Sequence, residues 1–110
     1  MALAERLPRY PIPMPCFALI YDLVDNFVER RQPYRTEHLA LLGEAQRDGR
    51  LLLAGPLKPA DTALLVFRAD TAADVESLVA RDPYVTNGLV KSWQVREWTV
   101  VVGTAAGDVR

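Results

Sequence analysis

Two side chains that can carry protons or bind anions, Arg35 and His38, lie three residues apart in the longest helical pattern of the sequence. When residues 33–48 are placed on a helix, the apolar side chains gather on one arc and most polar ones on the opposite arc. His38, the only histidine, falls in the middle of the apolar arc, and Arg35 lies on the same side one turn earlier. Polar groups aimed at the interior need partners. The pattern therefore predicts either a buried histidine bonded to a carbonyl, with Arg35 paired to an acid, or a functional site.

The composition limits the classes of function. The chain has 110 residues, half of them apolar and a quarter charged, which is typical of one soluble globular domain. The net charge is −1 and no run of Lys and Arg stands out, so we expect no nucleic-acid partner. No apolar run approaches the roughly 20 residues needed to cross a bilayer, so we expect no membrane partner.

The rare residue types also argue against a disulfide, a metal or a cofactor. Cys16 is the only cysteine, which excludes an internal disulfide and fits a reducing cytoplasm. One His and one Cys cannot give zinc-like ligand spacing, and nothing points to a carboxylate-only site for a hard cation, so we expect no metal site. No G-x-G-x-x-G follows a strand and no P-loop is present, so we expect no cofactor. Residues 1–15 lack the continuous apolar region of a secretory signal.

The chain divides into a proline-rich arm at residues 1–15, a domain at 16–103 and a small-residue tail at 104–110. Within the domain, apolar and β-branched runs predict four strands, at residues 16–21, 51–54, 63–68 and 89–102. The helical patterns predict one helix over residues 33–48, closed by Gly49, and a second that starts at Thr71 and stops at Asp82-Pro83. In the second helix, Thr71 and Asp74 are spaced as a capping box.

The resulting order, β-α-β-β-α-β, predicts an α+β fold of the ferredoxin-like kind, an antiparallel sheet with both helices on one face. The strands carry apolar residues at both odd and even positions, as in Phe17, Leu19 and Tyr21 against Ala18 and Ile20. The face without helices would therefore expose a large apolar patch. We expect a homodimer, or a higher homo-oligomer, in which two sheets pack face to face as an α/β barrel.

Several short motifs together resemble one known family, over about residues 16–102. They are Arg35-x-x-His38-Leu39, Gly49-Arg50-Leu51 leading into Gly55-Pro56, and Asp82-Pro83-Tyr84 followed by Gly88. In this order and spacing they are similar to the YCII-related domain family (YciI-like proteins). The resemblance implies a dimeric ferredoxin-like α/β barrel with a His–Asp catalytic pair, here His38 and Asp82, and chemistry of the dehydrochlorinase or isomerase type.

The residues themselves are compatible with that pair. A carboxylate bonded to one ring nitrogen of His38 fixes its tautomer and raises its basicity, so that the other nitrogen can act as a general base. Arg35 can bind a substrate carboxylate or phenolate, Gly55-Pro56 can admit substrate close to the backbone, and Tyr84 can donate a hydrogen bond. The alternatives are structural: Asp82 as a helix cap, Tyr84 as a core aromatic, and Gly55-Pro56 as strand-end geometry.

The sequence thus predicts a small cytoplasmic enzyme, without a cofactor, that abstracts a proton from a small cyclic or aromatic organic acid. Lyase, isomerase and dehydrochlorinase reactions all begin with such a step. The alternative is a non-catalytic dimeric module, in which the same pocket binds a small ligand or serves regulation and Arg35 matters more than His38.

Overall fold

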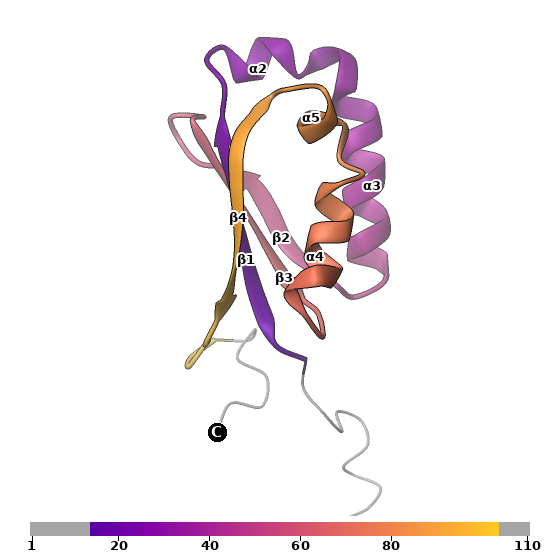
Figure 1. Cartoon of the computed structure of the whole chain (residues 1–110), viewed down its shortest axis with the longest axis vertical. Coiled ribbons are helices and arrows are strands. Elements are labelled where there is room, and N and C mark those ends of the chain that lie inside the picture. Colours follow the sequence, from indigo (N-terminus) through magenta and orange to yellow (C-terminus); the bar gives the residue numbers. More distant parts are fainter. Residues whose placement is uncertain (1–13, 104–110) are drawn as a thin grey trace, which may run out of the picture.

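One antiparallel sheet, covered on one face by helices, forms the part of the chain that the computed structural model describes, residues 14–103 (Figure 1). The strands are β1 (Cys16–Leu23), β2 (Leu51–Pro56), β3 (Thr62–Arg68) and β4 (Val90–Trp98). The helices are α2 (Phe27–Arg30), the 3₁₀ helix η2 (Gln32–Tyr34), α3 (Arg35–Arg47), α4 (Ala72–Val79) and α5 (Pro83–Thr86). The strand order is β2-β3-β1-β4, with every neighbouring pair antiparallel. The predicted α+β, ferredoxin-like arrangement is therefore confirmed.

The long helix is the predicted one with a different start. Pro33 lies in η2, and the α-helix proper runs from Arg35 to Arg47. Gly49 follows it with φ of +80°, a left-handed conformation that is cheap for glycine alone. The helix therefore ends where the sequence places its stop, and it turns directly into β2.

Helix α4 is shorter than the predicted second helix, and a further short helix, α5, follows it. The capping box is confirmed: the Thr71 side chain accepts from the Asp74 amide at 3.4 Å, and the Asp74 carboxylate accepts from the Thr71 amide. However, α4 already ends at Val79, and Asp82-Pro83 starts a helix instead of stopping one. Asp82 has extended backbone and caps α5, and Pro83 takes the first helical position, where a missing N–H costs nothing.

All four strands differ in length from the prediction: β1 extends to Leu23, β3 begins at Thr62, and β2 and β4 end at other residues. Gly55 and Pro56 are the last two residues of β2, which thus runs two residues beyond the predicted end at Ala54, and Pro56 pairs with Ala63. The proline is tolerated because β2 is an edge strand with a single neighbour. Strand β4 stops at Trp98, so residues 99–102 lie outside the sheet.

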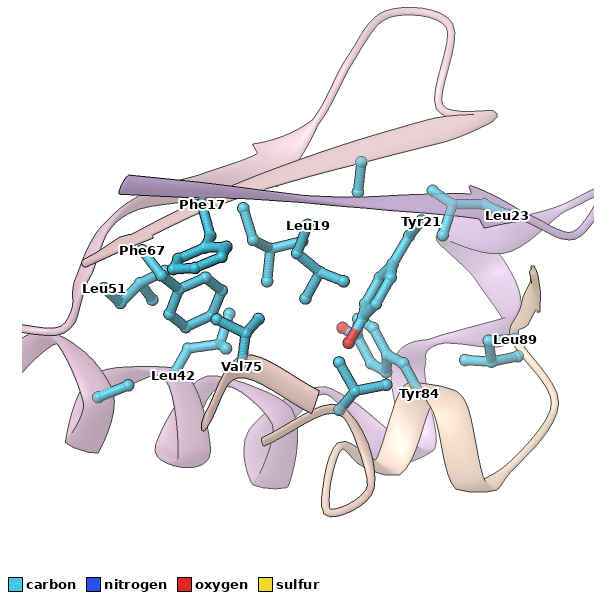
Figure 2. Close-up of a cluster of buried hydrophobic side chains, with 14 of the residues drawn as sticks. Phe17, Leu19, Tyr21, Leu23, Leu42, Leu51, Phe67, Val75, Tyr84 and Leu89 are labelled. Carbon is cyan, nitrogen blue, oxygen red and sulfur yellow. The ribbon is translucent and has the colours of Figure 1, made fainter. Parts of the chain in front are cut away.

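The core lies between the sheet and the helices. Alternate residues of β1 point inward (Figure 2), and they meet apolar side chains of β3 and α4. The buried members include Phe17, Leu19, Tyr21, Phe67 and Val75. Because the side chains of a strand alternate, Tyr21 is carried to the same face as Phe17 and Leu19, toward the helices.

The opposite face of the sheet is also apolar over β1, β2 and β3, as the strand pattern predicts, whereas β4 places the polar Gln94 and Arg96 beside Ile20 and Ala18. Ala18 and Val66 are register partners there, and so are Ile20 and Leu64. At the edges of this face, Leu53 is 62% exposed and Trp98 is 45% exposed. None of the helices described above packs on it.

Met14 and Pro15, the last residues of the predicted arm, are bonded to the chain at the end of β3. From the end of the predicted arm, the Met14 and Pro15 carbonyls accept from the Arg68 side chain at 3.2 Å and from the Ala69 amide at 3.1 Å. Residues 1–13 and the predicted tail at 104–110 lie outside the described residues. Over residues 14–103, no helix combines the length and apolarity that spanning a membrane requires.

Candidate active site

Asp82 is the best-connected polar side chain of the core. It is completely buried, with 0% exposure, and its carboxylate accepts three hydrogen bonds. Oδ2 accepts from the Tyr21 hydroxyl at 2.7 Å, whereas Oδ1 accepts from the Tyr84 amide at 3.0 Å and lies 2.7 Å from His38 Nδ1. Asp82 is therefore both a helix cap and a partner of the histidine, because Oδ1 caps α5 and also contacts His38.

His38 is held on two sides. It comes from the first turns of α3, is 8% exposed, and stacks on the Tyr84 ring with centroids 3.7 Å apart and planes at 7°. Because Asp82 Oδ1 already accepts from the Tyr84 amide and carries negative charge, the network assigns the proton of neutral His38 to Nδ1. That assignment leaves Nε2 unprotonated, and an imidazole with a carboxylate behind it is arranged to accept a proton there.

A cavity of about 140 Å³ opens beside His38, between α3, α5 and the strands. Its walls include five of the six predicted site residues, namely Arg35, His38, Gly55, Pro56 and Tyr84. The sixth, Asp82, lies behind His38 and reaches the cavity through it. Apolar cavities of roughly 150 Å³ admit a molecule of the size of benzene. The volume therefore suits a small ring, and Leu42, Ala63 and Leu65 supply apolar wall.

The buried face of α3 differs slightly from the face that the apolar arc predicts to be buried. Leu39 belongs to the apolar arc predicted for residues 33–48 but is 50% exposed, next to the cavity. Arg35 was expected to aim at the interior; it is exposed but forms part of the cavity wall. His38, Leu42 and Ala45 form the buried stripe instead. The helix thus presents His38 to Asp82 and keeps Arg35 and Leu39 beside the open side.

Two residues of this site were not predicted, Tyr21 and Arg31. Tyr21 was interpreted as strand hydrophobe, although a buried tyrosine hydroxyl usually has a partner, which is a usable signal. In Figure 2 its side chain extends from β1 toward Tyr84. Arg31 follows α2, contributes to the cavity wall, and lies four residues before Arg35. The polar segment around it has no periodicity that would have assigned it a direction.

Burial and charge shift the acidity of both tyrosines. Burial raises the pKa of Tyr21 far above its ordinary value, and the charge and hydrogen bond of Asp82 raise it further. Burial also raises the pKa of Tyr84, while the positive charges of Arg31 and Arg35 oppose that rise. Both phenols therefore remain neutral at physiological pH, and Tyr21 acts as a donor to Asp82.

Replacing Tyr21 by Phe is expected to change the alkaline stability of the protein. An unfolded tyrosine ionises near pH 10, whereas folded Tyr21 keeps its proton, so the native state binds more protons above that pH and the free energy of unfolding falls. Without the hydroxyl, this part of the alkaline decline disappears. Its loss also removes a hydrogen bond to a charged group, which costs about 1.5–3 kcal/mol at pH 7.

Urea unfolding from pH 7 to 11 measures both effects. Tyr34→Phe is the matched control, since the Tyr34 side chain makes no hydrogen bond within residues 14–103. Equal alkaline slopes for wild type and Tyr21→Phe would contradict the assignment.

Comparison with known proteins decides the family. Residues 14–99 match the model of the YCII-related domain. The chain belongs to the YCII-related domain family. The match covers the whole ferredoxin-like unit, including His38, Asp82 and every residue of the cavity wall, so the resemblance drawn from the short motifs is confirmed.

A solved structure with the same fold is similar to this YCII-related chain. It is 5-chloro-2-hydroxyhydroquinone dehydrochlorinase (TftG) from Burkholderia phenoliruptrix AC1100, in complex with 2,5-dihydroxybenzoquinone. The TM-score is 0.65 at 22% sequence identity, over 76% of this chain and 92% of that chain. At this identity the likeness establishes the fold. A comparison with curated proteins finds no match.

Proposed function

We propose that this YCII-related protein is a cytoplasmic enzyme that needs no cofactor and uses His38 as a general base on a small cyclic or aromatic organic acid. The observation that carries the proposal is the 2.7 Å contact between His38 Nδ1 and Asp82 Oδ1 beside a ring-sized cavity. Asp82 holds the tautomer and stabilises the imidazolium that forms when Nε2 takes the substrate proton. A base positioned in this way contributes roughly 10²–10⁴-fold to the rate. The buried thiol of Cys16 is compatible with a reducing compartment.

One proton abstraction leads to several balanced outcomes. In a dehydrochlorination, Nε2 takes a ring proton, its bonding electrons form the new double bond, and chloride leaves with the electrons of the C–Cl bond. His38 then returns the proton to water, so HCl is lost and no oxidant is needed. In an isomerisation the same proton returns to another carbon. The dehydrochlorinase activity of TftG and its quinone ligand support a ring-shaped substrate of this kind.

The alternative is a binding or regulatory module that holds a similar molecule without turning it over. The observation that favours it is the pair of arginines in the cavity wall, because they would serve binding with or without the base. The distinction rests on whether a proton is removed from the ligand.

Hydrogen–deuterium exchange at carbon tests this directly. A panel of chlorinated hydroquinones, hydroxyquinones and cyclic keto acids is incubated with the protein in D₂O and followed by NMR. Deuterium incorporation or chloride release above the buffer rate supports the enzyme, whichever product is formed. Ligands that bind in NMR titrations but exchange only at the buffer rate would support the module.

We further propose that the protein is a homodimer joined through the apolar outer face of the sheet. Ala18, Ile20, Leu64 and Val66 form the centre of that face. Faces of this kind are rarely left to water in a monomer. Light scattering is expected to give about twice the 12.3 kDa of one chain. Ile20→Glu, which places a charge in the centre of the face, is expected to give a folded monomer, whereas Val28→Glu on α2 stays dimeric. A wild-type mass near that of one chain would contradict the proposal.

A further inference from the structure

Two positive charges in the cavity wall have no acidic partner. Within residues 14–103, the ion pairs join His38 to Asp82, Arg81 to Glu44 and Lys91 to Asp22. Arg31 and Arg35 take part in none of them, although both line the cavity next to His38. Arg35 is exposed, whereas Arg31 is half-buried, and a partly desolvated cation without a counter-charge is unfavourable.

Arg31 is the more unusual of the two. Its Nε is buried and has no hydrogen-bond partner, and it is the one buried side-chain nitrogen or oxygen of this kind in the described part of the chain. The guanidinium carbon lies 5.5 Å from the centre of the Phe27 ring, which holds the group by a cation–π contact. The buried Nε and the Phe27 contact thus hold the guanidinium in place at the cavity wall, where its planar donors suit an anion.

The two arginines act on the same region of the cavity. Arg31 precedes the 3₁₀ helix η2 and Arg35 follows it, and both line the same cavity. Both of their charges oppose the rise in the pKa of Tyr84, whose ring stacks on His38. Both charges therefore lie close enough to the ring pair to act on it.

We propose that Arg31 and Arg35 form an anion site that binds a planar oxyanion of the ligand, a carboxylate or the oxygen of an enolate or phenolate, next to His38. The forked, planar donors of arginine match such oxygens. This proposal rests on the proposed function and deepens it, since it places the acidic group of the substrate at the two arginines, beside the base. In the reaction, the same charges stabilise the negative oxygen that develops when a proton leaves the neighbouring carbon.

Binding measured by calorimetry or NMR titration tests the site without requiring turnover. The probes are benzoate, 2,5-dihydroxybenzoquinone at a pH where it is anionic, and benzamide as the neutral analogue of benzoate. We expect at least one anion to bind tenfold or more tightly than benzamide to the wild type, and the tighter of the two identifies the kind of oxyanion. Equal binding of anions and benzamide, or no anion binding, would overturn the proposal.

The arginine variants locate the effect. Arg31→Gln and Arg35→Gln are each expected to weaken anion binding about 10- to 100-fold, the range for a lost hydrogen bond to a charged group, and to leave benzamide unaffected. Arg31→Lys keeps the charge but loses the fork, so we expect an intermediate affinity. Arg30→Gln is the matched control, because Arg30 is exposed and lies outside the cavity wall. Wild-type anion affinity in Arg31→Gln would overturn the assignment.

The outcomes separate this proposal from the proposed function. If anion binding depends on the arginines but no probe or panel member loses a proton, catalysis fails and the anion site stands. If turnover occurs while the arginine variants bind anions like the wild type, the anion site fails and catalysis stands.

Discussion

Replacing His38 by Asn is expected to reduce carbon–hydrogen exchange at least about 10²-fold, and up to about 10⁴-fold, while the protein still binds its ligand. An asparagine amide occupies the position of the Nδ1 edge of histidine and can keep a donor toward Asp82 Oδ1, but it has no basic nitrogen in place of Nε2. The buried carboxylate therefore keeps a partner and only the proton acceptor is lost. The measurement is the initial exchange rate at saturating ligand, with affinity determined separately.

Glu37→Gln is the matched control for this experiment, since Glu37 neighbours His38 on α3 but is exposed and outside the cavity wall. Its exchange rate is expected to equal that of the wild type. A His38→Asn protein that is folded, binds ligand and exchanges at the wild-type rate would show that another group removes the proton.

The sequence predicts the burial of His38 in the candidate site because this residue belongs to an element with a clear pattern. The amphipathic pattern of residues 33–48 predicts that His38 is buried, and the structure places it at 8% exposure. The phase of that helix is less well determined, since the apolar arc also includes Leu39, which is half exposed. A helix that borders a cavity need not bury its whole apolar arc, and this is why Leu39 is exposed although it belongs to that arc.

What the sequence does not predict depends on contacts between distant residues. Tyr21 and Asp82 are 61 residues apart, and strand alternation gives the face of Tyr21 but not the partner of its hydroxyl. Arg31 and Asp82 border α2 and α5, helices of four residues each, which are too short to show a period. Asp82-Pro83 therefore appeared as a stop signal, although the same two residues suit a helix start.

Replacing Asp82 by Asn is expected to impair both stability and catalysis. The carboxylate accepts from three donors, whereas an amide offers one oxygen. If the amide nitrogen faces Tyr21, the hydroxyl proton of Tyr21 loses its acceptor, and the negative charge behind His38 is gone. If it faces His38, the ring must carry its proton on Nε2 and cannot act as a base. Either orientation costs about 1–3 kcal/mol of folding free energy and about 10²–10⁴-fold in rate.

The control is Asp74→Asn, which changes the same functional group at the capping box of α4. Since Asp74 is exposed, we expect the loss of stability to stay near 0.5–1 kcal/mol or below and the exchange rate to equal that of the wild type. Urea unfolding and exchange kinetics on both variants separate the two roles of Asp82. A protein with Asn at position 82 that is destabilised but exchanges at the wild-type rate would limit Asp82 to capping α5, and the pairing with His38 would then have no part in catalysis. A simultaneous loss, with Tyr21→Phe affecting mainly stability, would indicate that the carboxylate supports the fold through Oδ2 and the base through Oδ1.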